Sequence, residues 1–182
     1  MKRYISFFVL LLVCVSCKDR HMETVKNEVV GRIGTIIMLP DSLQYRTLTD
    51  SLVPIPDKTL KIVTVINGEC FLCLNSFIEW KKEVEEFSSF GDVAILFYVT
   101  TSDFESLRKP LKDIEFDYPF FIDPNSDILF NNNIPLNKST LHTFLLDKDN
   151  KIVLIGSPLG NPKLADLYKH QIQQLSQKQA KK

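Results

Sequence analysis

The pattern of hydrophobic and polar positions divides most of the chain into short segments that predict alternating strands and helices. The β-branched and apolar run from Leu60 to Ile66 predicts a buried strand, and Asn67-Gly68 ends it with a tight turn. The next segment is amphipathic, with one apolar side at helical spacing. That side is formed by Leu74, Phe77, Ile78, Val84 and Phe87. We therefore expect a strand, a turn and a helix in this order.

The alternation continues into a second buried strand, predicted over Val93 to Thr100. Ser102, with Glu105 three residues later, has the spacing of a capping box and predicts the start of another helix. Pro110 should end or kink that helix, because proline lacks the backbone N–H that a helix interior needs. A short strand is then predicted over Tyr118 to Ile122.

An irregular segment and a hairpin are predicted next. The asparagine-rich stretch 123–138 contains two prolines and should form no more than one helical turn, around Ile128. Strands over 140–146 and 151–156 flank a polar turn at 147–150, which is the pattern of an antiparallel hairpin.

A final helix is expected from Asn161, a good N-cap, and Pro162, which suits the first helical position. Its apolar stripe consists of Leu164, Leu167, Tyr168, Ile172 and Leu175. The order of elements is β-α-β-α-β-β-α after a small N-terminal extension. We therefore expect an α/β fold, a three-layer sandwich with a mixed central sheet.

The start of the chain has the pattern of a secretory signal. A cationic segment, residues 1–3, precedes an apolar run over 4–15 that is shorter than a membrane span requires. The block that ends in Ser16-Cys17 resembles a lipobox, which implies a signal peptide over 1–16 and a lipid on Cys17. A plain cleaved signal and an uncleaved anchor are the alternatives, and in each case the body of the chain is exported.

The chain after the signal divides into an extension and one main domain. Residues 18 to about 30 are polar without a sustained period, as expected of a tether. Gly31 to Leu39 predicts one short strand, closed by a Pro-Asp turn, and an extended connection follows. We therefore expect a lipid-anchored tether and extension over 17–56, the folded domain over 57–178 and a basic tail over 179–182.

Composition narrows the possible functions. A chain of 182 residues with 45% hydrophobic content can build one ordinary domain. Lysine and arginine number 22, and so do aspartate and glutamate, so no overall charge favours nucleic acid or an anionic membrane surface. Only 6 glycines are present and none forms a phosphate-binding loop, so neither a nucleotide site nor a cofactor is expected.

The four cysteines fall into two classes. Cys14 leaves with the signal and Cys17 is taken by the lipid, which leaves Cys70 and Cys73 in the folded part. An exported compartment permits disulfides, but a pair so closely spaced closes too small a loop to stabilise a fold, which favours a reactive role. An inert disulfide and a metal site are the alternatives. A metal would need more ligands, and His142, the nearest histidine, is expected to be a structural or surface side chain of the hairpin.

The pair lies where the predicted strand ends and the helix begins, and this position suggests its chemistry. Helical residues three apart share one face with α-carbons about 5 Å apart, within the range of a disulfide. Cys70, expected in the first turn, would gain from the unpaired N–H groups and the helix dipole, which lower a thiol pKa. In this hypothesis Cys70 attacks a partner's disulfide and the more buried Cys73 resolves the mixed disulfide.

The cysteine pair after the strand 60–66, together with the hairpin segment 143–153, resembles the thioredoxin superfamily and in particular its TlpA-like, membrane-anchored branch. The resemblance covers roughly residues 58 to 177. It implies a thioredoxin-like fold and thiol:disulfide exchange without a cofactor. It also implies an active-site loop region formed by Glu69, Phe71, Leu72, Thr140 and Leu141 around the catalytic Cys70 and Cys73.

Several positions depart from that family's pattern. The slot of its cis-proline holds Leu141, before which we expect a trans peptide bond. Glu69 replaces the tryptophan before the first cysteine, and its charge is expected to raise the pKa of that thiol. The family's buried acid would fall near Thr64 or Ser76, and neither is acidic. Glu69 or Glu79 could substitute, although a solvated side chain is the simpler interpretation of each.

These observations favour a membrane-anchored thiol:disulfide oxidoreductase in the cell envelope, facing the periplasm or the cell exterior. Its partners would be thiols or disulfides of exported proteins. The alternative is a non-catalytic binding lipoprotein that keeps the thioredoxin scaffold and uses the cysteines as a structural disulfide. A peroxiredoxin-like peroxidase is disfavoured, because Gly68-Glu69-Cys70 lacks the threonine- and proline-rich setting of its reactive cysteine.

Overall fold

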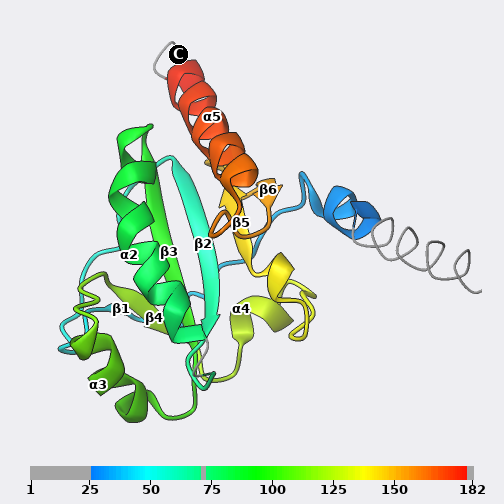
Figure 1. Cartoon of the computed structure of the whole chain (residues 1–182). Helices are drawn as coiled ribbons and strands as arrows, with labels where there is room; N and C mark the ends of the chain where they lie inside the picture. Colours follow the sequence, from blue (N-terminus) through cyan, green and yellow to red (C-terminus); the bar gives the residue numbers. More distant parts are fainter. Residues whose placement is uncertain (1–25, 71–72, 180–182) are drawn as a thin grey trace, which may run out of the picture. The chain divides into compact units, whose positions relative to one another are not determined.

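The computed structural model describes residues 26–70 and 73–179 (Figure 1). The predicted signal peptide, Cys17, Phe71 and Leu72 lie outside the described residues, as does most of the basic tail. The chain divides into two compact units, residues 1–33 and 34–182. In the described part of the first unit, residues 26–32 are helical, and Arg32 and Glu28 form an i,i+4 ion pair of 4.0 Å. Over residues 26–30 the expected irregular tether is therefore helical, which differs from the expectation.

The strand expected over Gly31 to Leu39 is also wrong. Ile36 makes only an isolated antiparallel bridge with Lys151. Backbone hydrogen bonds from Gly34 to Ile152 (2.8 Å) and from Ile37 to Asn150 (2.9 Å) nevertheless hold this segment beside the hairpin. The helix up to residue 32 takes up the first part of the run, so too few extended residues remain for a regular strand.

The second unit is built on one mixed sheet with the strand order β1-β4-β3-β2-β5-β6. Strands β2, β3 and β4 are parallel, and β1, β5 and β6 join the sheet by antiparallel pairing. The strands are β1 (Tyr45–Arg46), β2 (Leu60–Asn67), β3 (Val93–Thr100), β4 (Phe120–Ile122), β5 (Thr143–Leu146) and β6 (Ile152–Ile155). The predicted α/β fold with a mixed sheet is confirmed. Strand β1 lies where the sequence predicted only an extended connection.

The helices of this unit are α2 (Leu74–Ser89), α3 (Phe104–Asp113), α4 (Asp127–Phe130) and α5 (Pro162–Gln179), and Ser139–Leu141 forms the 3₁₀ turn η2. The start of α3 differs from the expected capping box. Its N-cap is Asp103, whose side chain accepts from the Ser106 backbone N–H. The helix also continues past Pro110 to Asp113, so the proline does not end it.

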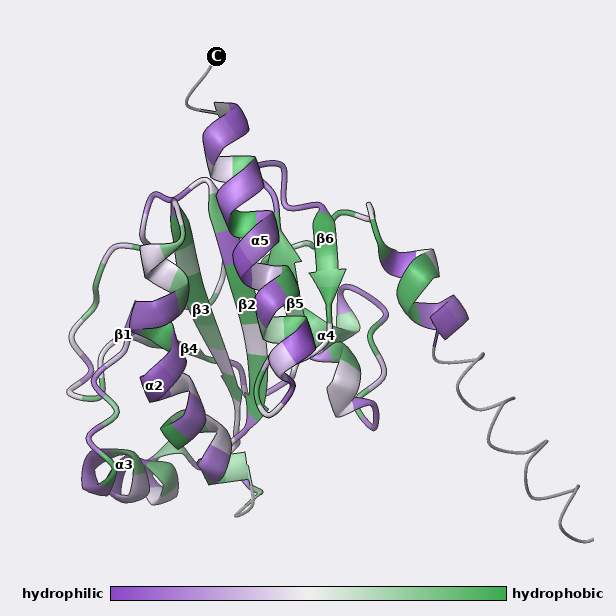
Figure 2. Cartoon of the chain, turned by 45° about the horizontal axis from the view of Figure 1, so that its top comes forward, coloured by the Kyte–Doolittle hydropathy of each residue, from purple (hydrophilic) through white to green (hydrophobic). Residues whose placement is uncertain are grey.

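One hydrophobic cluster joins α2, α3 and α5 to the sheet. Alternate residues of β2 and β3, among them Ile62 and Phe97, face the same cluster as Trp80 of α2 and Tyr168 of α5. Trp80 packs edge-on against Phe97 with ring centroids 5.9 Å apart. Figure 2 shows mostly hydrophobic strands behind helices α2 and α5, whose visible sides are mainly hydrophilic. This packing anchors both ends of α2, and with them the cysteine pair at its start.

The predicted caps of the last third are present. The Asn161 side chain accepts from the Leu164 backbone N–H at 3.2 Å, which starts α5 as expected. The Tyr168 hydroxyl donates to the Gly156 carbonyl at 2.8 Å and so ties α5 to the end of β6. Leu167, expected on the apolar stripe, is 40% exposed. It lies beside the buried face that Tyr168 and Ile172 form.

Candidate active site at the cysteine pair

The two cysteines stand in the turn between β2 and α2. The Asn67 side chain accepts from the Glu69 backbone N–H at 2.9 Å, and the Cys73 N–H donates to the Cys70 carbonyl at 2.8 Å. Cys73 is the N-cap of α2, which begins at Leu74. The expectation that Cys70 lies in the first helical turn is therefore wrong, because α2 begins only at Leu74, four residues later. Cys70 instead stands one turn ahead of the positive helix end.

Both cysteines are thiols and both are half-buried. Burial raises the pKa of Cys73 to about 11, with smaller contributions from a side-chain hydrogen bond with Cys70 and from the charge that the Cys70 sulfur carries when it is ionised. A hydrogen bond that raises the pKa of Cys73 is one in which Cys73 is the donor. Cys73 therefore keeps its proton at neutral pH, with its side chain hydrogen-bonded to that of Cys70. This is the arrangement that stabilises a thiolate on Cys70.

A cavity of about 370 Å³ opens beside the two thiols. The residues that line it carry hydroxyl, amide, imidazole, thiol or apolar side chains, and none of them is Asp, Glu, Lys or Arg. Its polar wall, besides the cysteines, consists of Thr64, Asn67, Ser76, Ser139, Thr140, His142, Thr143 and Ser157. Trp80 forms part of its apolar wall. The sequence-predicted Thr140 is thus brought to the cysteines.

A pair of buried threonines occupies the part of the wall where the family resemblance would place an acid. Thr64 and Thr143 are direct partners across β2 and β5, and their hydroxyl oxygens are 3.0 Å apart. Both side chains are almost fully buried, at 2% and 3% exposed. Their hydroxyl groups satisfy each other without any charge. The cavity therefore has no carboxyl group with which to take up a proton.

Leu141 does not line the cavity. It is 1% exposed and ends the short η2 turn, with its backbone N–H donating to the Lys138 carbonyl at 2.8 Å. The peptide bond before it is trans, as expected, since the described residues contain no cis peptide. The leucine side chain packs into the core, and the residues on either side of it, Thr140 and His142, face the cavity instead.

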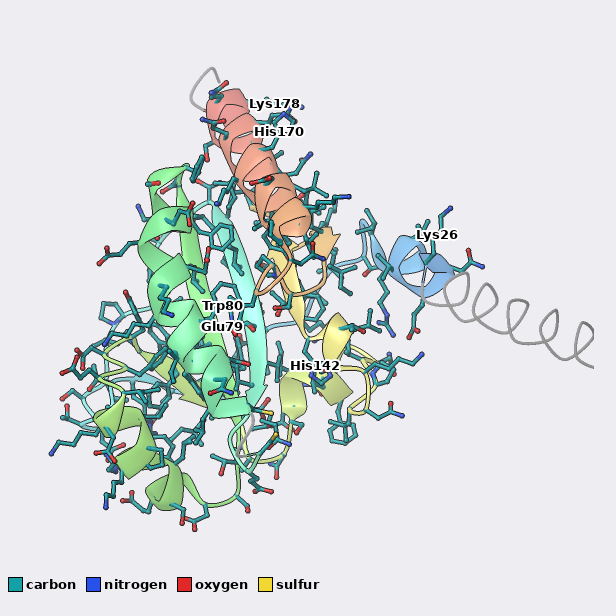
Figure 3. The ribbon with its side chains drawn as sticks, in the orientation of Figure 1. Lys26, Glu79, Trp80, His142, His170 and Lys178 are labelled. Carbon is teal, nitrogen blue, oxygen red and sulfur yellow. The ribbon has the colours of Figure 1, made fainter. Side chains whose placement is uncertain are left out.

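Glu69 is turned toward the start of α3. Its carboxylate accepts from both the backbone N–H (2.8 Å) and the hydroxyl (2.7 Å) of Ser102. These two hydrogen bonds lower the pKa of Glu69 below its ordinary value. Glu69 is exposed and ionised at neutral pH, which makes it a poor proton shuttle. Glu79, the other acid considered, is exposed on α2, next to the buried Trp80 in sequence (Figure 3).

His142, which the sequence analysis named as the nearest histidine but expected to be a structural or surface side chain, belongs to the site. It follows η2 and precedes β5, so it is not part of the hairpin strand as expected. Its ring is half-buried, with Nε2 3.0 Å from the Pro135 carbonyl oxygen, and burial lowers its pKa. It lines both the cysteine cavity and a second cavity of about 230 Å³. Figure 3 labels its side chain. Its place next to Leu141 was the signal that brought it near the cysteines in the sequence analysis.

The described residues contain no group of three or more His, Cys, Asp or Glu side chains placed to hold a metal ion. Within the same residues, no helix has the length and apolar character needed to cross a membrane.

No family model and no curated protein matches the chain. Solved structures do match. The thioredoxin domain of a thiol-disulfide oxidoreductase from Bacteroides vulgatus is 17% identical with a TM-score of 0.58, over 77% of this chain and 97% of that one. A secreted thiol-disulfide isomerase from Corynebacterium glutamicum is 16% identical with a TM-score of 0.56, over 74% of this chain and 85% of that one. The chain therefore has the thioredoxin-like fold that its cysteine pair and hairpin predicted.

The hydrogen bond between the two thiols can be tested by titration. In Cys70→Ala the pKa of Cys73 should fall below about 11 but stay above that of an ordinary cysteine, because burial, the larger cause, remains. Thiolate absorbance in the ultraviolet measures this pKa. An unchanged value would show that the Cys70 sulfur does not interact with Cys73, and Ser76→Ala, on the same cavity, is the control.

Proposed function

We propose that this protein is a thiol:disulfide oxidoreductase in which Cys70 is the attacking cysteine and Cys73 the resolving one. The observation that carries this proposal is the pairing of the thiols at the mouth of the cavity. With a pKa of about 11, Cys73 holds its proton at neutral pH, and its side chain is hydrogen-bonded to that of Cys70. A thiolate on Cys70 is stabilised both by that hydrogen bond and by the positive start of α2.

The exchange needs only the two cysteines and a partner. The Cys70 thiolate attacks one sulfur of the partner's disulfide, the partner's S–S bond breaks, and a mixed disulfide and one partner thiolate result. Cys73 then attacks the Cys70 sulfur, which forms the Cys70–Cys73 disulfide and releases the second partner thiolate. Two electrons pass from the cysteine pair to the partner. The reverse sequence oxidises a dithiol.

Substitution of each cysteine separates the two roles. Cys70→Ser should abolish disulfide reduction, whereas Cys73→Ser should accumulate mixed disulfides that cannot be resolved. Turnover with a disulfide-bonded protein substrate and non-reducing gels measure these outcomes. Undiminished activity in Cys70→Ser would refute the assignment, and Cys14→Ser, within the predicted signal, should behave as wild type.

A second candidate function is a binding module whose cysteines form a permanent disulfide. The neutral Thr64–Thr143 pair and the buried Leu141 favour it, because both depart from the pattern of a catalytic thioredoxin site. In this alternative the cavity beside the cysteines docks a partner without exchange chemistry.

The reduction potential of the pair distinguishes the two functions. An exchanging pair should lie between roughly −270 and −180 mV, the range of thioredoxin to protein disulfide isomerase, and an inert bond below about −300 mV. Equilibration with glutathione or dithiothreitol buffers measures it. A value below about −300 mV would favour the binding module.

We also infer that the protein acts in the cell envelope, on exported partners and from a lipid anchor at Cys17. The support is the cationic and apolar start of the chain with Ser16-Cys17 at its end. One protein of similar structure, that from Corynebacterium glutamicum, is described as secreted.

The anchor can be tested by substitution and labelling. In a bacterial host, Cys17→Ala should abolish incorporation of radioactive fatty acid and move the protein out of the membrane fraction. Cys14→Ala is the matched control and should keep the label. Labelling that survives Cys17→Ala but not Cys14→Ala would reassign the anchor.

A further inference from the structure

Besides the cysteines, the described residues of the cavity wall include one ionisable side chain, the imidazole of His142. Of the lining residues, only Cys70, Cys73 and His142 carry ionisable groups. The remaining polar side chains of the cavity wall are hydroxyls and one amide, which do not act as bases at neutral pH. Any proton that leaves a cysteine within this cavity therefore has a single side chain that can accept it.

The environment of His142 determines which ring nitrogen is available. A carbonyl oxygen can only accept, so the 3.0 Å contact with the Pro135 carbonyl requires a hydrogen on Nε2. Nδ1 then keeps its lone pair. The backbone N–H of His142 donates to the Ser139 carbonyl at 3.0 Å, which holds the residue at the end of η2. The imidazole is thus fixed at both its ring and its backbone with one nitrogen ready to accept a proton.

Few charges lie near this imidazole. Among the described residues lining the two cavities that His142 borders, Glu69 is the only one with a carboxylate, and none has an ammonium or guanidinium group. The Glu69 carboxylate is occupied by both donors of Ser102. Burial lowers the pKa of His142, so the ring is neutral at pH 7.

Cys73 needs such an acceptor. In the mixed disulfide the Cys70 sulfur carries no charge, but burial, the largest cause of the raised Cys73 pKa, remains, so Cys73 stays largely protonated at pH 7. No buried acid can take up this proton either, because the position where the family resemblance would place an acid is occupied by Thr64, which pairs with Thr143. The resolving step would therefore be slow unless another group removes the proton.

We propose that His142 is the proton acceptor for Cys73 during resolution of the mixed disulfide, a role that rests on the exchange function proposed above. The proton moves from the Cys73 sulfur to Nδ1, directly or through one water in the cavity. Cys73 attacks the Cys70 sulfur, the bond between Cys70 and the partner breaks, and the imidazolium returns the proton to the departing thiolate. The imidazole is neutral again at the end of the step.

The test isolates this step. Reaction of the reduced protein with Ellman's reagent forms a mixed disulfide on Cys70, and Cys73 then displaces thionitrobenzoate, a thiolate that leaves without a proton. In the wild type the rate of this release should rise with pH until a break below the ordinary pKa of histidine, and above that pH it should stay constant. In His142→Gln the release should be about 100-fold slower at pH 7. Its rate should also rise tenfold per pH unit across the neutral range, following the thiolate fraction of Cys73.

The variant is chosen to preserve the fold. The glutamine amide can still donate to the Pro135 carbonyl, and His170→Gln, an exposed histidine on α5, is the matched control, expected to keep the wild-type rate and break. A second measurement needs no variant. The NMR titration midpoint of His142 in the wild type should coincide with the break in the rate profile.

The outcomes separate the two proposals. Formation of the mixed disulfide releases one thionitrobenzoate, and the attack by Cys73 releases a second. If the wild-type protein never releases the second one, the exchange function is overturned, and the role of His142 with it. If the release rate of His142→Gln still levels off with pH as in the wild type, whether at the wild-type rate or at a uniformly lower one, only the role of His142 is overturned. A midpoint that differs from the break by more than one pH unit does the same.

Discussion

The close packing of the turn after β2 is the constraint on which the candidate site depends. Gly68 lies so near its neighbours that an added Cβ would stand 2.9 Å from Leu107 Cδ2 and 3.1 Å from Thr101 Cβ. Its N–H donates to the Thr100 carbonyl at 2.9 Å, which ties the turn to the end of β3. The turn is therefore held between β3 and α3, and this fixes where Cys70 stands relative to the start of α2.

The second feature of the site is its neutrality. A buried carboxyl group must be hydrogen-bonded or must shift its pKa upward, because its charged form loses hydration. The threonine pair avoids that cost with a single hydrogen bond between Thr64 and Thr143. Because threonines occupy this position, the cavity wall beside Cys73, whose thiol pKa is raised, contains no carboxyl group among the described residues. An imidazole at the edge of the cavity is then the remaining base, and His142 stands there because η2 turns the chain just before β5.

Around the site, the fold is completed by segments with weak local signals. Strand β1 is only two residues long and exists because Tyr45 and Arg46 pair with Phe121 and Phe120. The Tyr45 and Phe121 rings also pack against each other, with centroids 4.9 Å apart. The Arg108 guanidinium adds an ion pair of 2.7 Å to Asp50, which holds the loop after β1 against α3. None of these contacts is between near neighbours in sequence.

The main strands and helices, the mixed α/β fold and the cysteine pair between β2 and α2 could all be predicted from the sequence. These features depend on period, turn residues and caps, all of which act over a few neighbouring residues. Tertiary structure decided the rest. Asp103, and not Ser102, is the N-cap of α3, because Ser102 instead donates to the carboxylate of Glu69, which follows β2. His142 reached the cysteine cavity, and Leu141 left it, because the η2 turn and the β2–β5 pairing set their directions, and no local pattern records a contact between residues about seventy positions apart.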